Sequence, residues 1–568
     1  MRFVFQVLLL ALPLCHAAPA ADLAIGKRYL HLPVARGGEL RNVRIRSGNE
    51  TLHYFRIALP KDKSDPLYWT SIDAGALKGK TLAVVALPPG PEIDMASLCE
   101  QSDAVRQPSN LYREAYRPQY HFTAATGWIN DPNGLVYYDG EYQLFYQHDP
   151  YGSGGANKSW GRAVSRDLVH WTDFGDVLLP DRLGAIYSGS AVIDHRNTSG
   201  FQRGSPPPMV VFYTSAGDHA PERLPFTQSL AYSSDRGRTW TKFAGNPVIG
   251  HIEGTNRDPK VFWHDPSRRW VMALYLNRGK FALLGSSNLR QWSKLSDVEF
   301  PDGFECPEFF EMPVDGDAAN TRWVFWEAGG RHRIGRFDGR NFAAETAVLP
   351  SEWGGNSYAG QTWNDAPGGR RLFISWMAAS GKRAPEPIYP GMPFNQQMSF
   401  PREFSLRTTP DGPRIFAQPA REIAKLYARQ HRWANVKLGA SGNPLARLSG
   451  ELFDIEADVE LREARTLKLD LRGTPIVFDA AAGRLTCLGK SAEFRPANGR
   501  LDLRVLADRT SIEIFAAGGR CVLSFCFKPD PANRKLSLTA DGGAALVRTL
   551  RVRELTPALP AFTRPAWR

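Results

Sequence analysis

The chain has 568 residues, too many for one hydrophobic core, so two or three domains are expected. Hydrophobic residues make up 43% and charged residues 23%, the proportions of a globular protein, and the 15 Trp suit both β structure and carbohydrate stacking. The net charge of +12 comes from scattered arginines without a basic run, which argues against a nucleic-acid-binding protein.

The N-terminus has the pattern of an export signal. Met1-Arg2 is followed by an apolar run to Leu14 and then by small residues, so residues 1–20 are predicted to be a secretory signal peptide. The large Leu14 disfavours lipid attachment at Cys15. The apolar run is too short to cross a bilayer, and no later segment is apolar enough. We expect a secreted or periplasmic protein with no membrane span.

The remaining cysteines are Cys99, Cys306, Cys487, Cys521 and Cys526. This odd, scattered set is not a disulfide framework. Cys521 and Cys526 are five residues apart on one predicted strand, face opposite sides and should not pair. Because no Cys/His cluster has the spacing of metal ligands, we expect neither a metal ion nor a cofactor.

Residues 22–115 are predicted to form a small N-terminal β-domain. Val43 and Ile45 alternate with arginines, and residues 81–87 form a second strand that ends at Pro88-Pro89-Gly90. Nothing in this segment indicates chemistry.

Residues 116–417 show strands and turns with hardly any helical periodicity. Asp139-Gly140 between two apolar runs predicts a hairpin. A Ser-Asp/Asn turn that leads into Trp171 recurs before Trp240 and Trp292, at spacings of 69 and 52 residues. A propeller blade takes about 40–50 residues and insertions lengthen it, so we predict a five-bladed β-propeller.

Residues 418–568 alternate cleanly between apolar and polar positions. Phe453, Ile455, Ala457 and Val459 fall on one face, as do residues 501, 503 and 505. Strands of this length separated by Gly or Asp turns predict a C-terminal antiparallel β-sandwich. The fold class is therefore all-β.

The most unusual run in the propeller segment is WINDPNG, residues 128–134. Asn, Asp, Pro and Gly each break regular structure, so we interpret it as a turn rather than a strand. Pro132 should push Asp131 toward an extended conformation. A tryptophan beside a fixed carboxylate is a suitable way to hold a sugar.

Two further acidic motifs lie in the same segment. Asp258 precedes a proline and follows Arg257, and Glu305 lies between Phe304 and Cys306. Glycoside hydrolysis needs two carboxyl groups in different protonation states, one as nucleophile and one as acid. Asp131 suits the nucleophile, whereas the apolar neighbours of Glu305 should raise its pKa and keep it protonated.

The other two residues named in these motifs, Asp258 and Arg257, are expected to have supporting roles. Asp258 could bind sugar hydroxyls and stabilise an oxocarbenium-like transition state, and Arg257 could steady Glu305 or a hydroxyl. Each acid alone is more often a structural turn residue. Three on one propeller favour a catalytic set.

At these residues the chain resembles the β-fructosidases of glycoside hydrolase family 32, which include invertases, inulinases and levanases. The motifs at residues 128–134, 257–259 and 305–307 carry the resemblance, with further matches at residues 117–122, 145–148, 160–161, 187–190 and 508–511. It covers about residues 115–555.

This resemblance implies a five-bladed propeller plus sandwich and a retaining mechanism, with carboxyls roughly 5–5.5 Å apart. It places nucleophile, transition-state stabiliser and acid/base on Asp131, Asp258 and Glu305. The substrate-binding residues that we expect are Trp128, Asn130, Gln147, Trp160, Ser188, Arg257 and Trp326.

Residues 358–363 and 391–398 look most like bacterial levanases, so the expected substrate is β-2,6-linked fructan or its oligosaccharides. Asp149, Arg162 and Ser357 depart from residues frequent in the family and are expected near the pocket rim. The alternatives are an inulinase or invertase, a fructosyltransferase, and a non-catalytic fructan-binding propeller. The sequence does not indicate an oligomeric state.

Overall fold

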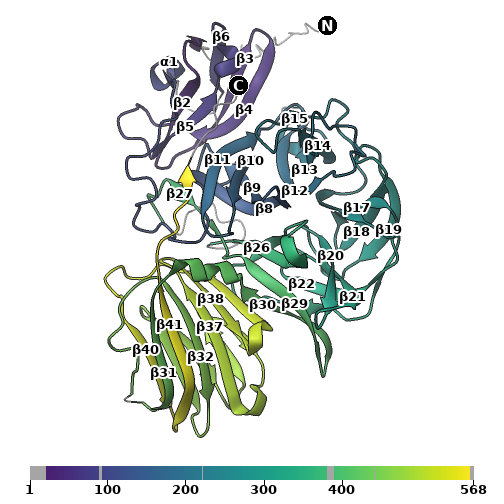
Figure 1. Cartoon of the computed structure of the whole chain (residues 1–568). Coiled ribbons are helices and arrows are strands. Elements are labelled where there is room, and N and C mark those ends of the chain that lie inside the picture. Colours follow the sequence, from purple (N-terminus) through teal and green to yellow (C-terminus); the bar gives the residue numbers. More distant parts are fainter. Residues whose placement is uncertain (1–20, 88–92, 221, 380–388, 441, 563–568) are drawn as a thin grey trace, which may run out of the picture. The chain divides into compact units, whose positions relative to one another are not determined.

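The structure, a computed structural model, describes residues 21–87, 93–220, 222–379, 389–440 and 442–562. The chain divides into two compact units, residues 1–106 and 107–568 (Figure 1). The predicted signal peptide, with Cys15, lies outside the described residues. In the ranges given above, no helix has the length and apolar character needed to cross a membrane.

The first unit consists of two small sheets. Val43, Ile45, Phe55 and Ile57 are buried as the alternation predicts. One sheet has the order β1-β6-β3-β4 and the other β5-β2-β7. Their bounds, with the short helical elements, are β1 (Ala21–Ala24), β2 (Tyr29–Val34), β3 (Leu40–Ser47), β4 (Glu50–Ala58), β5 (Tyr68–Asp73), η1 (Gly75–Leu77), β6 (Thr81–Leu87), α1 (Met95–Leu98) and β7 (Glu100–Ser102).

The second unit begins with five antiparallel blades arranged around an axis (Figure 1). The first three blades are β8 (Gly127–Tyr138), β9 (Glu141–Asp149), β10 (Ser159–Ser165) and β11 (Trp171–Leu178); β12 (Ala185–Ile193), β13 (Met209–Ala216), β14 (Thr227–Ser233) and β15 (Thr241–Lys242); and β16 (Arg257–His264), β17 (Arg269–Asn277), β18 (Lys280–Ser286) and β19 (Ser293–Glu299). A one-turn element, η2 (Gly217–His219), follows β13.

The last two blades share a sheet, because β20 pairs in parallel with β29 at Val314 and Leu406. Their strands are β20 (Glu308–Val314), β21 (Asp317–Trp326), β22 (Arg331–Phe337), β23 (Phe342–Ala344) and β24 (Leu349–Pro350), then β25 (Tyr358–Thr362), β26 (Arg371–Met377), β28 (Gln397–Met398), β29 (Arg402–Thr409) and β30 (Gly412–Pro419), with η3 (Pro367–Gly369) before β26. The short β27 (Phe394–Asn395) pairs with β8 and so links the last blade to the first.

Hydrogen bonds join the first strands of neighbouring blades. The Ser190 hydroxyl donates to the Pro259 carbonyl, and Asn364 Nδ2 donates to the carbonyls of Ala191 and Val261. These bonds bring residues of the second, third and fifth blades together although they are distant in sequence.

The turn that precedes each predicted Trp has one shared geometry. Leu168, Arg236 and Leu289 all have φ of 63°, and the preceding Asp or Asn side chain accepts backbone amides two to four residues ahead. Trp171 opens β11, and Trp240 and Trp292 directly precede β15 and β19, as predicted. In the fourth blade the same turn forms at Asp338, but Phe342 replaces the Trp and hides the repeat.

The C-terminal part is the predicted sandwich. A six-stranded sheet, β31-β41-β32-β37-β38-β39, and a five-stranded sheet, β36-β35-β34-β33-β40, share one hydrophobic core. Cys521 and Cys526 are both free. The bounds are β31 (Tyr427–Leu438), β32 (Phe453–Glu460), β33 (Thr466–Leu471), β34 (Thr474–Asp479), β35 (Arg484–Cys487), β36 (Lys490–Glu493), β37 (Arg500–Ala507), β38 (Ser511–Ala516), β39 (Cys521–Cys526), β40 (Leu536–Asp541) and β41 (Ala545–Leu555).

Three short helical elements belong to the sandwich segment, η4 (Arg421–Leu426), η5 (Ala497–Gly499) and η6 (Ala517–Gly519). The last strand, β42 (Ala561–Phe562), leaves the sandwich and pairs with β11 of the first blade.

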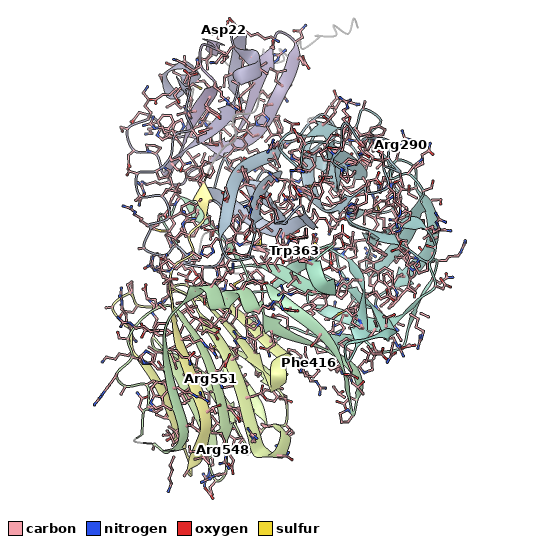
Figure 2. All side chains as sticks on the ribbon, in the orientation of Figure 1. Asp22, Arg290, Trp363, Phe416, Arg548 and Arg551 are labelled. Atoms are coloured by element: carbon pink, nitrogen blue, oxygen red, sulfur yellow. The ribbon has the colours of Figure 1, made fainter. Side chains whose placement is uncertain are left out.

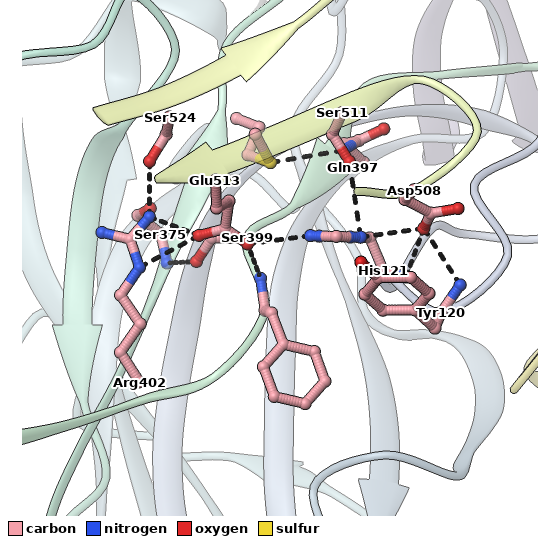
Figure 3. Close-up of polar contacts among 12 residues, drawn as sticks. Tyr120, His121, Ser375, Gln397, Ser399, Arg402, Asp508, Ser511, Glu513 and Ser524 are labelled. Atoms are coloured by element: carbon pink, nitrogen blue, oxygen red, sulfur yellow. Dashed lines mark hydrogen bonds and ion pairs between the residues drawn. The ribbon is translucent and has the colours of Figure 1, made fainter. Parts of the chain in front are cut away.

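Sandwich and propeller meet in a buried polar cluster (Figure 3). His121 lies between Asp508 and Glu513, with each ring nitrogen 2.8 Å from a carboxylate oxygen. Arg402 of β29 also pairs with Glu513. An apolar core beside it includes Phe515 of the sandwich and extends to the fully buried propeller residue Trp363 (Figure 2). The two domains are thus joined by buried contacts of both kinds.

Candidate active site

Asp131 lies in a strand, so the turn interpretation of residues 128–134 is wrong. The run belongs to β8, and its pairing with β9 shifts register between Ile129 and Pro132 and again after Asn133. Along its other edge β8 has only short contacts, a two-residue pairing with β27 and a single bridge between Val136 and Asn364. Proline is tolerated at such edges and bulges because no ladder hydrogen bond is lost.

Two short hydrogen bonds fix the Asp131 carboxylate. Ser188 Oγ donates to Oδ2 at 2.6 Å and Asn130 Nδ2 donates to Oδ1 at 2.9 Å. Burial raises the pKa of Asp131 to about 6, helped by the negative charge of Glu305, and the two hydrogen bonds oppose this rise. Asp131 is therefore an oriented carboxylate that loses its proton only near neutral pH.

Asp258 is held in an uncommon backbone conformation at the second position of β16. Its φ is 64°, and its amide donates to Thr214 Oγ1 at 2.9 Å. Burial raises the pKa of Asp258 to about 7, against the opposing charge of Arg257. Non-glycine residues at positive φ are costly and gather at functional sites.

Cys306 joins the two aspartates. Its amide donates to Asp258 Oδ2 at 3.0 Å, and its Sγ lies 3.5 Å from that oxygen and 3.6 Å from Asp131 Oδ2. Burial and the surrounding carboxylates raise the pKa of this thiol well above its ordinary value. The protonated thiol is thus a donor shared between two carboxylates from different blades.

Glu305 stands opposite these residues, just before β20. Arg257 donates to its Oε2 from Nη2 at 2.8 Å and from Nε at 3.1 Å, and the Tyr358 hydroxyl lies 2.6 Å from its Oε1. The expected apolar setting is wrong, because Phe304 is 38% exposed and both Glu305 oxygens have polar partners. Of the two partners proposed for Arg257, the structure shows Glu305.

Arg257 is itself confined. Burial lowers the pKa of this guanidinium, but Asp258 and Glu305 raise it above its ordinary value. Its Cζ lies 4.7 Å from the centre of the Tyr275 ring and 5.1 Å from that of Phe304. The aromatic rings and carboxylates together fix a permanent positive charge at the site.

Two buried acceptors near Asp131 lack partners among the described residues. These are Asn130 Oδ1 and Gln147 Oε1, whereas Gln147 Nε2 donates to the Ile186 carbonyl at 2.9 Å. An unsatisfied buried acceptor is costly. Both oxygens could accept hydrogen bonds from the hydroxyl groups of a bound sugar.

The expected tryptophans have different surroundings. Trp128 belongs to an apolar group with Cys306, Tyr358 and Trp376 that lines the carboxylates. Trp160 is fully buried and donates to the Tyr187 carbonyl, so it supports β12 from behind.

Trp326 does not join this group. Its indole packs against His332, Phe373 and Phe404 in the core between the last two blades and the sandwich. The structure therefore does not support it as a substrate contact.

Two neighbouring polar groups have structural roles. Glu308, three residues after Glu305, pairs with Lys260 at 3.0 Å, and both are buried. Arg162, expected near the rim, donates instead to Gln143 Oε1 beside Phe174. Neither contacts the three candidate carboxyl groups.

Known protein families match most of this chain. Residues 121–419 match the glycosyl hydrolases family 32 N-terminal domain, and residues 422–554 match the family 32 C-terminal domain. The chain belongs to glycosyl hydrolase family 32. It is a glycosidase by this membership.

Family 32 relatives cover most of the second unit. A levanase of Bacillus subtilis is 36% identical over 79% of this chain and 71% of its own length. A second levanase, from Bacillus sp. (strain L7), is 34% identical, and the match covers 53% of that protein. The crystal structure of exo-inulinase from Aspergillus awamori superposes with a TM-score of 0.70 and 27% identity, covering 79% of this chain and 99% of that one.

The sequence analysis did not point to two residues that lie beside the candidate carboxyl groups. Tyr358 was recognised only as part of a motif, and its contact with Glu305 spans 53 residues. Lys158 has no motif, and its place over Trp128 depends on the path of a loop. No local signal pointed to either role.

Proposed function

We propose that this glycosidase releases fructose from β-2,6-linked fructan (levan) by a retaining double displacement. The observation that carries the proposal is the meeting of Asp131, Asp258 and Glu305 from three blades, with Cys306 between the two aspartates. The levanase relatives support the linkage. An exo-inulinase relative is 30% identical, so cleavage of β-2,1 linkages is the second candidate activity.

In the first step, Asp131 attacks C2 of the terminal fructosyl unit. The bond between C2 and the glycosidic oxygen breaks, and this oxygen takes a proton from Glu305. Ser188 and Asn130 hold the attacking carboxylate, and Arg257 and Tyr358 hold the acid.

In the second step, Glu305 takes a proton from water, and the water oxygen attacks C2. The ester bond to Asp131 breaks and restores its carboxylate. Asp258 contributes by binding hydroxyl groups whose contacts strengthen as positive charge develops on the sugar ring. The configuration at C2 is retained.

The first experiment follows products from levan, inulin and sucrose over time. Fructose alone from levan, faster than from inulin, is the expected result. Faster release from inulin would overturn the linkage, and no release from any of the three would overturn hydrolysis in favour of a binding propeller. Transfer of fructosyl units to added sugar, in place of release, would indicate a transferase.

A second experiment tests the roles of the acids. Asp131→Asn should lose essentially all activity, whereas Asp297→Asn, at an exposed carboxylate on β19, should retain it. Near-wild-type activity of Asp131→Asn would show that another residue is the nucleophile. Nuclear magnetic resonance of the first product should show the retained anomer.

We also propose that the protein acts outside the cytoplasm, on the basis of the signal-like residues 1–20. Recovery of the processed protein from the periplasm or medium is the expected result of fractionating cells that express the full chain. A cytoplasmic, unprocessed protein would contradict it.

A further inference from the structure

Lys158 reaches the catalytic strand from two strands away. Trp128 of β8 pairs with Asp149 of β9, and Ser159, the first residue of β10, pairs with His148. Lys158 therefore lies beside Asp149, in one row with Trp128. Asp131 follows Trp128 by three residues on the same strand.

Asp149 shapes the loop that presents Lys158. Its fully buried carboxylate accepts the Tyr151 amide at 3.0 Å, the Asn157 amide at 3.1 Å and Asn157 Nδ2 at 2.8 Å. Asn395 of β27 fixes the middle of the loop by donating to the Ser153 carbonyl at 2.7 Å. The position of Lys158 is thus set by buried hydrogen bonds at both ends of the loop.

The loop packs directly on Trp128. Gly155 has φ of +69°, and a Cβ there would lie 2.8 Å from the Trp128 ring. Lys158 Nζ donates to the Gly155 carbonyl at 2.8 Å and lies 3.9 Å from the ring centre of Trp128. This is a cation–π contact of a partly buried side chain, and together with the hydrogen bond it fixes the ammonium group.

The ammonium group acts on charges on either side of it. Burial lowers the pKa of Lys158 to about 8, while Asp149 and Asp131 oppose this fall. The effect is reciprocal, since Lys158 opposes the rise in the pKa of Asp131. Among the described residues, Lys158 forms no direct ion pair, so its charge acts at longer range.

The other charges at the site do not replace it. Glu305 raises the pKa of Asp131, and Asp258 lies on the other side of Cys306, whose Sγ is 3.6 Å from Asp131 Oδ2 and 3.5 Å from Asp258 Oδ2. Arg257 is engaged by Glu305. On the Trp128 side, Lys158 is therefore the cation that opposes the effect of Glu305 on Asp131.

We propose that Lys158 is a positioning residue whose ammonium group, held over Trp128, keeps the nucleophile Asp131 ionised. The proposal rests on the nucleophilic role assigned above. It adds a specific electrostatic function to a loop whose other described contacts are the buried hydrogen bonds of Asp149 and Asn395.

The first test is the pH profile of kcat/KM for Lys158→Met. Its acidic limb should move to higher pH by about half a unit, with a several-fold loss of activity at pH 5.5 and a smaller loss at pH 7. Lys158→Arg keeps the charge, so its acidic limb should lie at the wild-type pH. Lys294→Met, at an exposed lysine, should not move the acidic limb. An unmoved limb in active Lys158→Met, or in Lys158→Gln if the first variant does not fold, would overturn the proposal.

The second test does not depend on catalysis. Melting temperatures of the wild type, Lys158→Gln, Asp131→Asn and the double variant are compared at pH 7 and pH 5. At pH 7, Asp131→Asn should raise the melting temperature more when it is introduced into Lys158→Gln than when it is introduced into the wild type. At pH 5, it should change the melting temperature by the same amount in both. Equal effects at pH 7 would overturn the role of Lys158, whereas a wild type that hydrolyses no fructan would overturn the proposed function alone.

Discussion

Both Arg257 nitrogens that face Glu305 donate to the same carboxylate oxygen, Nη2 at 2.8 Å and Nε at 3.1 Å. The other oxygen is left to the Tyr358 hydroxyl. Because the partners come from the third and fifth blades, the orientation of Glu305 depends on how the blades are arranged around the axis.

Replacing Arg257 should therefore impair catalysis more than folding. Arg257→Met is expected to lower kcat/KM on the order of 100-fold, because a charge-assisted pair that orients the acid is lost. Fructose release measures the effect, with Arg290→Met, at an exposed arginine labelled in Figure 2, as control. A loss of less than about twofold in a folded variant would contradict the role.

Replacing Asp131 should stabilise the fold. The folded pKa of Asp131 is about 6, above its ordinary value of 3.8, so its contribution to stability is fully present below pH 3.8 and is lost as pH rises through 6. Asp131→Asn should therefore raise the free energy of unfolding by on the order of 2 kcal/mol at pH 7.

The gain should shrink toward zero near pH 4, where the wild-type carboxyl is protonated. Urea denaturation at both pH values measures it. If Asp131→Asn and the wild type had the same free energy of unfolding at pH 7, burial of the Asp131 charge would not destabilise the fold.

The contact between sandwich and propeller should weaken in alkali. Burial lowers the pKa of His121, but hydrogen bonds to Asp508 and Glu513 raise it to about 9, above the ordinary 6.5. Its contribution is therefore fully present below pH 6.5 and is lost as pH rises through 9. We expect the melting temperature to fall between pH 8 and pH 10.

His121→Gln tests this origin of the alkaline loss. It should cost about 3–5 kcal/mol at pH 7, because two buried carboxylates each lose their charged contact with His121, and much less at pH 10. His170→Gln, at an exposed histidine, is the control. An equal cost at both pH values would contradict the charge argument.

Gly189 should tolerate no side chain. A Cβ there would overlap the Phe212 carbonyl oxygen of β13, and the Gly189 amide donates to Asn133 Oδ1 at 3.0 Å. Gly189→Ala should cost about 3 kcal/mol or more, since the backbone must shift next to Ser188. Gly250→Ala, which meets nothing within 4 Å, is the matched control, and equal thermal stability of the two variants would contradict this prediction.

Periodicity predicted the architecture well. Ile455 and Val505 are buried in the sandwich core because alternation on a strand depends only on the residues of that strand. The Trp171 repeat worked for the same reason, since its turn is built from adjacent residues. Where the fourth blade keeps the turn but not the tryptophan, the repeat could not be seen.

The contacts of the site were less predictable because they are long-range. The neighbours of Glu305 in sequence suggested an apolar setting, whereas Arg257, 48 residues away, supplies a charge. Local composition at Pro132 suggested a turn, but a strand whose register shifts on both sides of Pro132 accepts the same residues. Trp326 had the residue type of a sugar contact, and only its blade position shows that it lies in the core.

The His121 cluster also sets an order of events during synthesis. A ribosome makes residue 121 long before residues 508 and 513, so the emerging propeller carries an unpaired histidine, as well as an Arg402 that lacks its Glu513 partner. Neither cation reaches its final partners until β38 has been made. The propeller therefore completes its buried charge pairing only when the chain is almost fully translated.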